Sequence, residues 1–155
     1  MEQKTKIHAE DGKQEITITR EFDLPVELVF KAYTEPELLE QWMGTKVLKL
    51  ENKNHGSYAF ETKNAEGKVV FKANGVIHET IPDQKITRTF EMENSPFEVQ
   101  IEFLEFEKLT NDTSKLTIHT IYRSIPLRDQ MLQLPFAKGI NWAHNRLQDV
   151  ASKLK

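Results

Sequence analysis

The chain has 155 residues, of which 38% are hydrophobic and 29% are charged, and its formal net charge is −3. This size and balance suit one domain with a packed core, and the lack of a clustered basic excess argues against nucleic-acid binding. The absence of cysteine excludes disulfides, cysteine-bound zinc and cysteine nucleophiles. The polar N-terminus shows no signal peptide and no stretch is long enough to span a membrane, so we expect a cytoplasmic location.

The N-terminal part of the chain predicts one strand followed by two short helices. Hydrophobic and polar residues alternate over residues 15–22, as in a half-buried strand. Pro25 suits the first turn of a helix, and residues 26–33 place their apolar side chains on one helical face. A second start signal at Pro36 opens another short helix, which Gly44 should end.

The central part of the chain predicts a run of strands joined by short turns. Alternating apolar residues indicate strands over residues 46–52, 57–63, 68–80, 85–93, 97–107 and 115–124. Short turns favour antiparallel neighbours, and with residues 15–22 included we expect seven strands. Alternation from Phe97 to Phe103 changes phase at Leu104, which predicts a bulge.

The C-terminal part changes to a helical period. Apolar residues from Phe136 to Leu154 recur at spacings of four and three residues, which predicts a long amphipathic helix. Pro135 lacks a backbone donor, so we expect a break near residues 131–134. Gly139 should permit close approach of the sheet or a ligand, or add a bend.

These elements define an α+β fold of the helix-grip class. We expect a seven-stranded curved antiparallel sheet wrapped around the long C-terminal helix, with two short helices after the first strand. The chain should form a single domain over residues 1–155, with an ordered core over about residues 15–154.

Residues 18–42 carry a family resemblance, with the sequence ITREFDLPVELVFKAYTEPELLEQW. A strand that ends in an Arg-aromatic step, a proline-led helix, a Thr-x-Pro-Glu step and Trp42 resemble the START-like, birch-pollen-allergen-like superfamily. Gly75 and Gly139 also fit. Within that group the chain is most similar to homologues of the activator of the 90-kDa heat-shock protein ATPase. The superfamily holds ligand carriers, cyclases, hydroxylase subunits and chaperone regulators, so the resemblance implies a fold more than one function.

A cavity between the sheet and the last helix is our first functional hypothesis. The small residues Ala73 and Gly75 should face inward and leave space there, with Trp42 and Met43 near its open end. We expect a small hydrophobic or amphipathic ligand, and neither a cofactor nor a metal. Strand phase and helix face predict ligand contacts from Trp42, Phe60, Phe71, Gly75, Ile77, Phe90, Ile101, His119, Phe136 and Ile140.

Three polar residues have two interpretations each. Arg20 and Glu79 lie in phase with apolar residues, so each is either a polar anchor in the pocket or, as we favour, a strand-end residue that reaches water. His119 either lines the cavity or, the interpretation we favour, is a partly exposed strand residue. None of the five histidines has metal-ligand spacing.

Two other functions stay open at this point. The resemblance implies a co-chaperone that acts on a chaperone ATPase. The same cavity could also support a cyclase or dehydratase with His119 or Glu79 as acid or base. The exposed edges of the sheet could pair in a homodimer.

Overall fold

One curved antiparallel sheet organises the chain, and a computed structural model describes residues 4–155 of it. In that part of the chain the sheet has eight strands in the order β1-β2-β8-β7-β6-β5-β4-β3. The strands are β1 (Lys6–His8), β2 (Glu15–Phe22), β3 (Lys46–Leu50), β4 (Ser57–Lys63), β5 (Val69–Ile81), β6 (Lys85–Met92), β7 (Val99–Lys108) and β8 (Ser114–Ile121). Every neighbouring pair is antiparallel.

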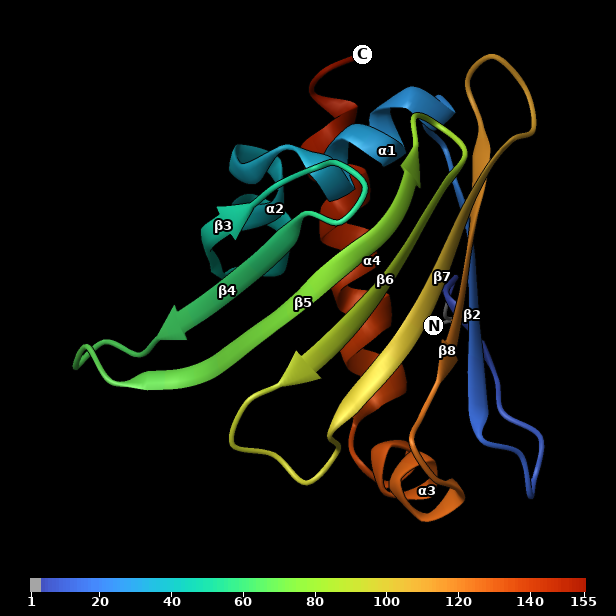
Figure 1. Cartoon of the computed structure of the whole chain (residues 1–155). Helices are drawn as coiled ribbons and strands as arrows, with labels where there is room; N and C mark the ends of the chain where they lie inside the picture. The colour runs from blue at the N-terminus through green and yellow to red at the C-terminus, as the bar shows by residue number, and fades with distance from the viewer. Residues whose placement is uncertain (1–3) are drawn as a thin grey trace.

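Four helices accompany the sheet in the part of the chain that the structure describes. They are α1 (Val26–Thr34), α2 (Pro36–Met43), α3 (Ile125–Gln133) and α4 (Phe136–Ser152). The sheet curls around α4, with α1 and α2 near the C-terminal end of that helix and α3 at its other end (Figure 1). The predicted α+β fold with a C-terminal helix against an open antiparallel sheet is therefore confirmed.

The strand count differs from the prediction by one. The additional strand, β1, pairs with β2 through Lys6, Ile7 and His8, and the two short helices therefore follow the second strand. A segment of three residues is too short to show alternation above the background of a polar N-terminus. It is a strand because β2 offers it a free edge.

The predicted break before the last helix is confirmed. The hydroxyl of Ser124 caps α3 by accepting from the Leu127 amide at 3.3 Å. The chain then leaves the helix after Gln133, and α4 begins beyond Pro135. The close approach expected at Gly139 is not found, because a Cβ atom placed there meets no atom within 4 Å. The glycine brings no neighbour close to the helix.

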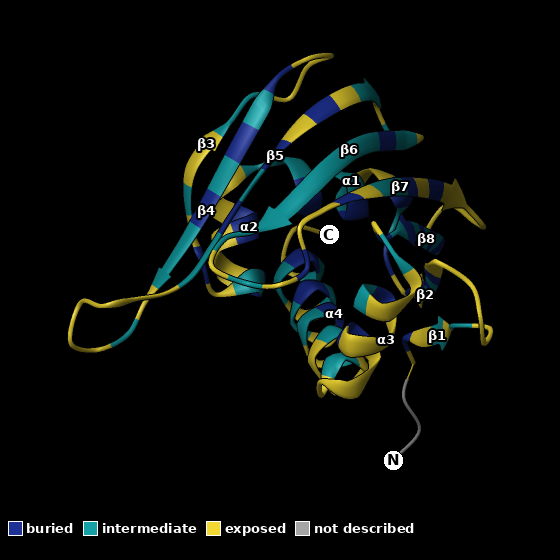
Figure 2. Ribbon diagram, turned by 60° about the horizontal axis from the view of Figure 1, so that its bottom comes forward, coloured by how far each residue is buried: buried dark blue, intermediate teal, exposed yellow. Residues whose placement is uncertain are grey.

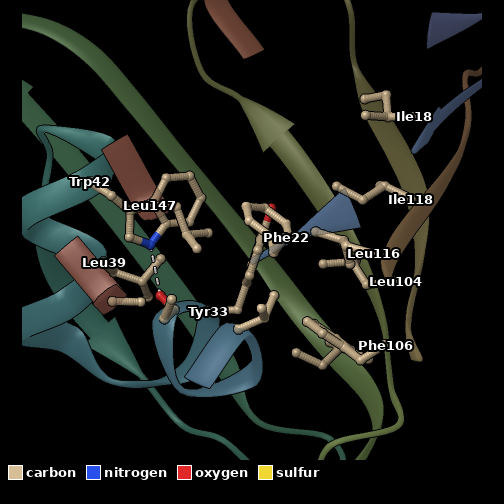
Figure 3. Close-up of a cluster of buried hydrophobic side chains, with 14 of the residues drawn as sticks. Ile18, Phe22, Tyr33, Leu39, Trp42, Leu104, Phe106, Leu116, Ile118 and Leu147 are labelled. Atoms are coloured by element: carbon tan, nitrogen blue, oxygen red, sulfur yellow. Dashed lines mark hydrogen bonds between the residues drawn. The ribbon is translucent and has the colours of Figure 1, made fainter. Parts of the chain in front are cut away.

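The core lies between the inner face of the sheet and the helices. Figure 3 shows Ile18, Leu104, Phe106, Leu116 and Ile118 on the sheet side, with Leu39, Trp42 and Leu147 on the helix side. The C-terminal half of α4 is held firmly, since Leu147 and Ala151 are fully buried. Its N-terminal half is more exposed, as Figure 2 shows by colour. None of the helices within residues 4–155 has the length and hydrophobicity needed to cross a bilayer.

Candidate ligand-binding site

A cavity of about 290 Å³ lies between the sheet and the helices. The more exposed half of α4 forms part of its wall, together with α1, α2, α3 and the strands β2, β6, β7 and β8. The residues that line it are Ile18, Tyr33, Leu39, Trp42, Met43, Arg88, Phe90, Met92, Gln100, Glu102, Ile118, Thr120, Tyr122, Met131, Phe136, Ile140 and Ala143.

Trp42 anchors the helical wall. Its indole Nε1 donates a hydrogen bond to the carbonyl oxygen of Ala32 at 2.8 Å, across the joint between α1 and α2. That carbonyl has no helical partner, because the residue four positions on is Pro36, which has no N–H. The same side chain packs against Tyr33 with ring centroids 5.0 Å apart. The bond therefore fixes the angle between the two helices and the position of the ring in the wall.

The opposite wall carries a polar cluster on β6 and β7. Arg88 and Glu102 are direct partners across the two strands, and Arg88 Nε donates to Glu102 Oε1 at 2.8 Å. Gln100 Nε2 donates to the other carboxylate oxygen of Glu102 at 2.9 Å. The Arg88 guanidinium also lies over the Tyr58 ring, 5.2 Å from its centroid. The cluster is thus held rigidly on the floor of the cavity.

Burial and neighbouring side chains together set the protonation state of these groups. Burial lowers the pKa of Arg88, but its interactions with Tyr58 and with Glu102, which is bonded to the guanidinium, raise that pKa above its ordinary value. Burial raises the pKa of Tyr33 and of Tyr58, and raises that of Tyr122 with a further contribution from Glu102. The arginine is therefore charged near neutral pH, and the three phenols keep their protons.

A second polar chain runs behind the cavity wall. Arg20 Nη1 donates to Thr5 Oγ1 at 3.0 Å, and that hydroxyl lies 3.1 Å from His144 Nδ1. The other ring nitrogen of His144 lies 3.1 Å from the Tyr33 hydroxyl. Desolvation first, and the charge of Arg20 second, lower the pKa of His144 to about 3. A neutral imidazole therefore holds Tyr33 in place in the wall.

Four of the predicted contact residues lie in the cavity wall. They are Trp42, Phe90, Phe136 and Ile140. Met43, expected near the open end, lines the cavity as well.

Another four predicted contacts face the core without reaching the cavity. Phe60 and Ile77 are fully buried in the packed cluster, and Phe71 packs against that cluster. Gly75 does not leave space as expected, because a Cβ there would lie 2.5 Å from the Tyr58 ring and 2.1 Å from the Thr89 carbonyl oxygen. Tyr58 already fills the volume that the missing side chain frees.

The last two predicted contacts lie on the outer face of the sheet. Ile101 is 42% exposed, and the register of β7 with β8 runs without a shift, so the predicted bulge at Leu104 is wrong. His119 bonds Glu15 at 2.9 Å and packs beside Phe103, as the interpretation of a partly exposed strand residue requires.

Arg20 and Glu79 have opposite outcomes. Arg20 is only 3% exposed, so its interpretation as a strand-end residue in water is wrong. Glu79 pairs with Lys85 at 2.7 Å near the β5–β6 turn and is half-exposed, as expected of a strand end. Neither residue lines the cavity.

The polar floor is not predicted by the alternation of apolar residues. The apolar phase of a strand normally marks its inner face, and on β7 that phase would leave Glu102 outside. A signal was present, because Arg88 lies in phase with the buried Ile86 on β6, and Glu102 lies in phase with the buried Leu104 on β7. Opposite charges in the inward phase of adjacent strands indicate a buried pair.

The family model described as "Activator of Hsp90 ATPase homolog 1-like protein" matches residues 23–152. The chain belongs to this family. The match starts after β2 and covers all four helices and the strands β3 to β8. A search of curated proteins found no match.

Solved structures share the fold of this Hsp90-activator-like chain at low sequence identity. A solution structure of an Arthrobacter aurescens protein has a TM-score of 0.83 at 17% identity, covering 96% of this chain and 91% of that one. A crystal structure of a Rhodobacter sphaeroides protein has a TM-score of 0.84 at 17% identity, with 97% and 99% covered. A Staphylococcus epidermidis protein has a TM-score of 0.79 at 20% identity, with 94% of each chain covered. These structural similarities show that the chain and the three proteins share one fold.

Proposed function

We propose that the chain binds a small, mostly apolar molecule in the cavity between the sheet and α4. The observation that carries this proposal is a space of about 290 Å³ with an apolar helical wall and a compact polar floor. Protein interiors are close-packed, and voids much larger than a water molecule are few. A small number of placed polar groups in an otherwise apolar pocket is the usual arrangement of a ligand site.

The volume limits the size of the ligand. At roughly 30 Å³ for each non-hydrogen atom, the value for liquid water, the cavity holds on the order of ten such atoms. Three methionines, Met43, Met92 and Met131, belong to the wall and can adjust to ligands of different shape. The expected ligand is therefore a medium-sized amphipathic molecule, smaller than a sterol.

Filling the cavity tests this proposal. The probes are n-butylbenzene, 1-nonanol and 2-nonanone, each close to the size that the cavity holds. We expect at least one to raise the Tm of the unmodified chain, because a ligand that binds only the folded state stabilises it. The substitution Ala143→Phe places a large ring in the cavity and should abolish this shift.

The control is Ala137→Phe, on the exposed side of the same helix. It should leave the ligand-induced shift unchanged. A set of probes that shifts neither the parent chain nor the control, or shifts Ala143→Phe equally, would overturn the proposal.

The family description supports a second candidate function, a co-chaperone that stimulates an Hsp90-type ATPase. ATP turnover by the chaperone, measured with and without the chain, tests it directly. An increase that saturates with the concentration of the chain supports a co-chaperone. Unchanged turnover together with no capture in a pull-down contradicts it.

A cyclase or dehydratase with the predicted acid–base residues has no support in the cavity. His119 lies on the outer face of the sheet, and Glu79 pairs with Lys85 at a strand end. Neither reaches a ligand held against α4. The cytoplasmic location and the homodimer stay predictions from the sequence.

A further inference from the structure

We propose that the ligand is electrically neutral and presents a carbonyl-type oxygen to Arg88. This inference rests on the proposed function, since it describes what the same cavity selects. It follows from the balance of charge in the wall, from the hydrogen-bond donors left over on the floor, and from the apolar helices opposite.

The cavity wall has no net charge. Arg88 and Glu102 are the two charged side chains among the lining residues, and they form one ion pair. Their side chains are 14% and 12% exposed, so little water reaches them. A carboxylate or an ammonium group brought into this space would add an unbalanced charge, and burying such a charge is costly. The charge balance therefore favours a neutral ligand.

The floor of the cavity has more free donors than acceptors. Arg88 uses Nε for Glu102, while neither of its two terminal nitrogens has a hydrogen-bond partner within residues 4–155. Both carboxylate oxygens of Glu102 already accept a bond, one from Arg88 and one from Gln100. The protonated hydroxyl of Tyr122 lines the same floor. Two guanidinium nitrogens and a phenol suit an accepting oxygen, as in a ketone, ester or amide.

On the opposite, helical wall the polar atoms of Tyr33 and Trp42 are already bonded, to His144 and to the Ala32 carbonyl. Met131, Phe136 and Ile140 face the space from α3 and α4. A ligand with one accepting oxygen on an apolar body matches both walls, because its oxygen can meet Arg88 while its hydrocarbon part lies against the helices.

Three probes of nearly equal size test whether the cavity prefers a neutral acceptor, an anion or a purely apolar ligand. They are 2-nonanone, a neutral acceptor; octanoate, an anion; and n-butylbenzene, which is apolar. Binding is followed by Trp42 emission in a Trp142→Phe background, since the chain has two tryptophans and Trp142 is 57% exposed. We expect 2-nonanone to bind about tenfold or more tightly than either other probe, the difference that one charge-assisted hydrogen bond supplies.

Glu102→Gln provides the decisive variant. It keeps the shape of the side chain but leaves Arg88 as an unbalanced cation, so octanoate should gain about tenfold or more relative to 2-nonanone. Glu105→Gln is the matched control, because Glu105 lies on the same strand but is exposed on the outer face. It should leave the order of the probes unchanged.

If Glu102→Gln does not fold, the double variant Arg88→Met, Glu102→Gln removes both charges together. In that protein 2-nonanone should lose its advantage over n-butylbenzene. Octanoate that binds the parent as tightly as 2-nonanone, or n-butylbenzene that does, overturns the inference and leaves the proposed function standing. Absence of binding by all three probes, with Ala143→Phe indistinguishable from the parent, overturns the proposed function itself.

Discussion

The His144 ring and the Tyr33 hydroxyl lie 3.1 Å apart in the core, and this contact joins α4 to α1. His144 is fully buried, and its other nitrogen faces Thr5, which in turn accepts from Arg20. A protonated imidazole would place a second positive charge in this chain of contacts without an acidic partner. The folded state therefore requires neutral His144.

Stability should fall on acidification because of this histidine. Its pKa is about 3 in the folded state and near 6.5 when exposed, so the unfolded chain binds the proton more readily. The contribution is fully present above pH 6.5 and is lost as the pH falls toward 3, with a slope of up to about 1.4 kcal/mol per pH unit. Urea unfolding between pH 7.5 and 4.5 measures it.

His144→Gln removes the titrating group, so its stability should decline less steeply with acid than that of the parent. His8→Gln, at an exposed position on β1, should follow the parent curve. If the unfolding free energy of His144→Gln and that of the parent fall equally with acid, His144 is not the group responsible.

The indole of Trp42 should matter more than its apolar surface alone. Trp42→Phe keeps an aromatic ring but leaves the Ala32 carbonyl without a donor, so we expect a loss of about 1–3 kcal/mol in the free energy of unfolding. Trp142→Phe should change it by about 1 kcal/mol or less, since that ring is exposed and contacts Arg146 at the surface. Chemical denaturation compares the two. Equal losses of unfolding free energy in the two variants would show that the hydrogen bond to Ala32 adds nothing to stability.

Two glycines should respond in opposite directions to alanine. Gly75→Ala drives a methyl group into the Thr89 carbonyl and the Tyr58 ring, so it should cost about 1–3 kcal/mol or more. Gly139→Ala meets open space on an exposed helix and should stabilise the protein by about 0.5–1 kcal/mol. Thermal melts of both variants test this. A tolerated Gly75→Ala would mean that Tyr58 can move away.

Removing one partner of the Arg88–Glu102 pair should be worse than removing both. Arg88→Met leaves a buried carboxylate without its cation, with an expected cost of about 3–5 kcal/mol. The double variant with Glu102→Gln should recover a large part of that loss, since no uncompensated charge is left. A double-mutant cycle of unfolding free energies measures the difference. Strictly additive losses would argue that the two side chains do not interact.

Much of the architecture could be predicted because local signals and tertiary packing agree. The helix that begins after Pro135 shows this, since an apolar stripe and a backbone without a donor point to the same boundary. β1 shows the converse. Nothing in Lys6, Ile7 and His8 specifies a strand, and the edge of β2 determines their conformation.

The candidate site was only partly predictable for a related reason. Periodicity identifies the inner face of a strand by its apolar residues, and that assumption holds where the face is packed. On β7 the inner face lines a cavity and carries Gln100 and Glu102, while Val99 and Ile101 are exposed outside. Over the part of β7 that forms the polar floor, the apolar side chains therefore mark the outer face of the sheet and the polar ones mark the inner face.

The two ends of the strand order also affect how the protein behaves in concentrated solution. At one end β1 offers only three residues for further pairing. At the other, β3 exposes Lys46 and Lys49, and its register with β4 shifts between Val47 and Lys49. Short strands, lysines and irregular register all oppose the addition of a strand from another molecule. We therefore expect the sheet to resist open-ended growth into aggregates.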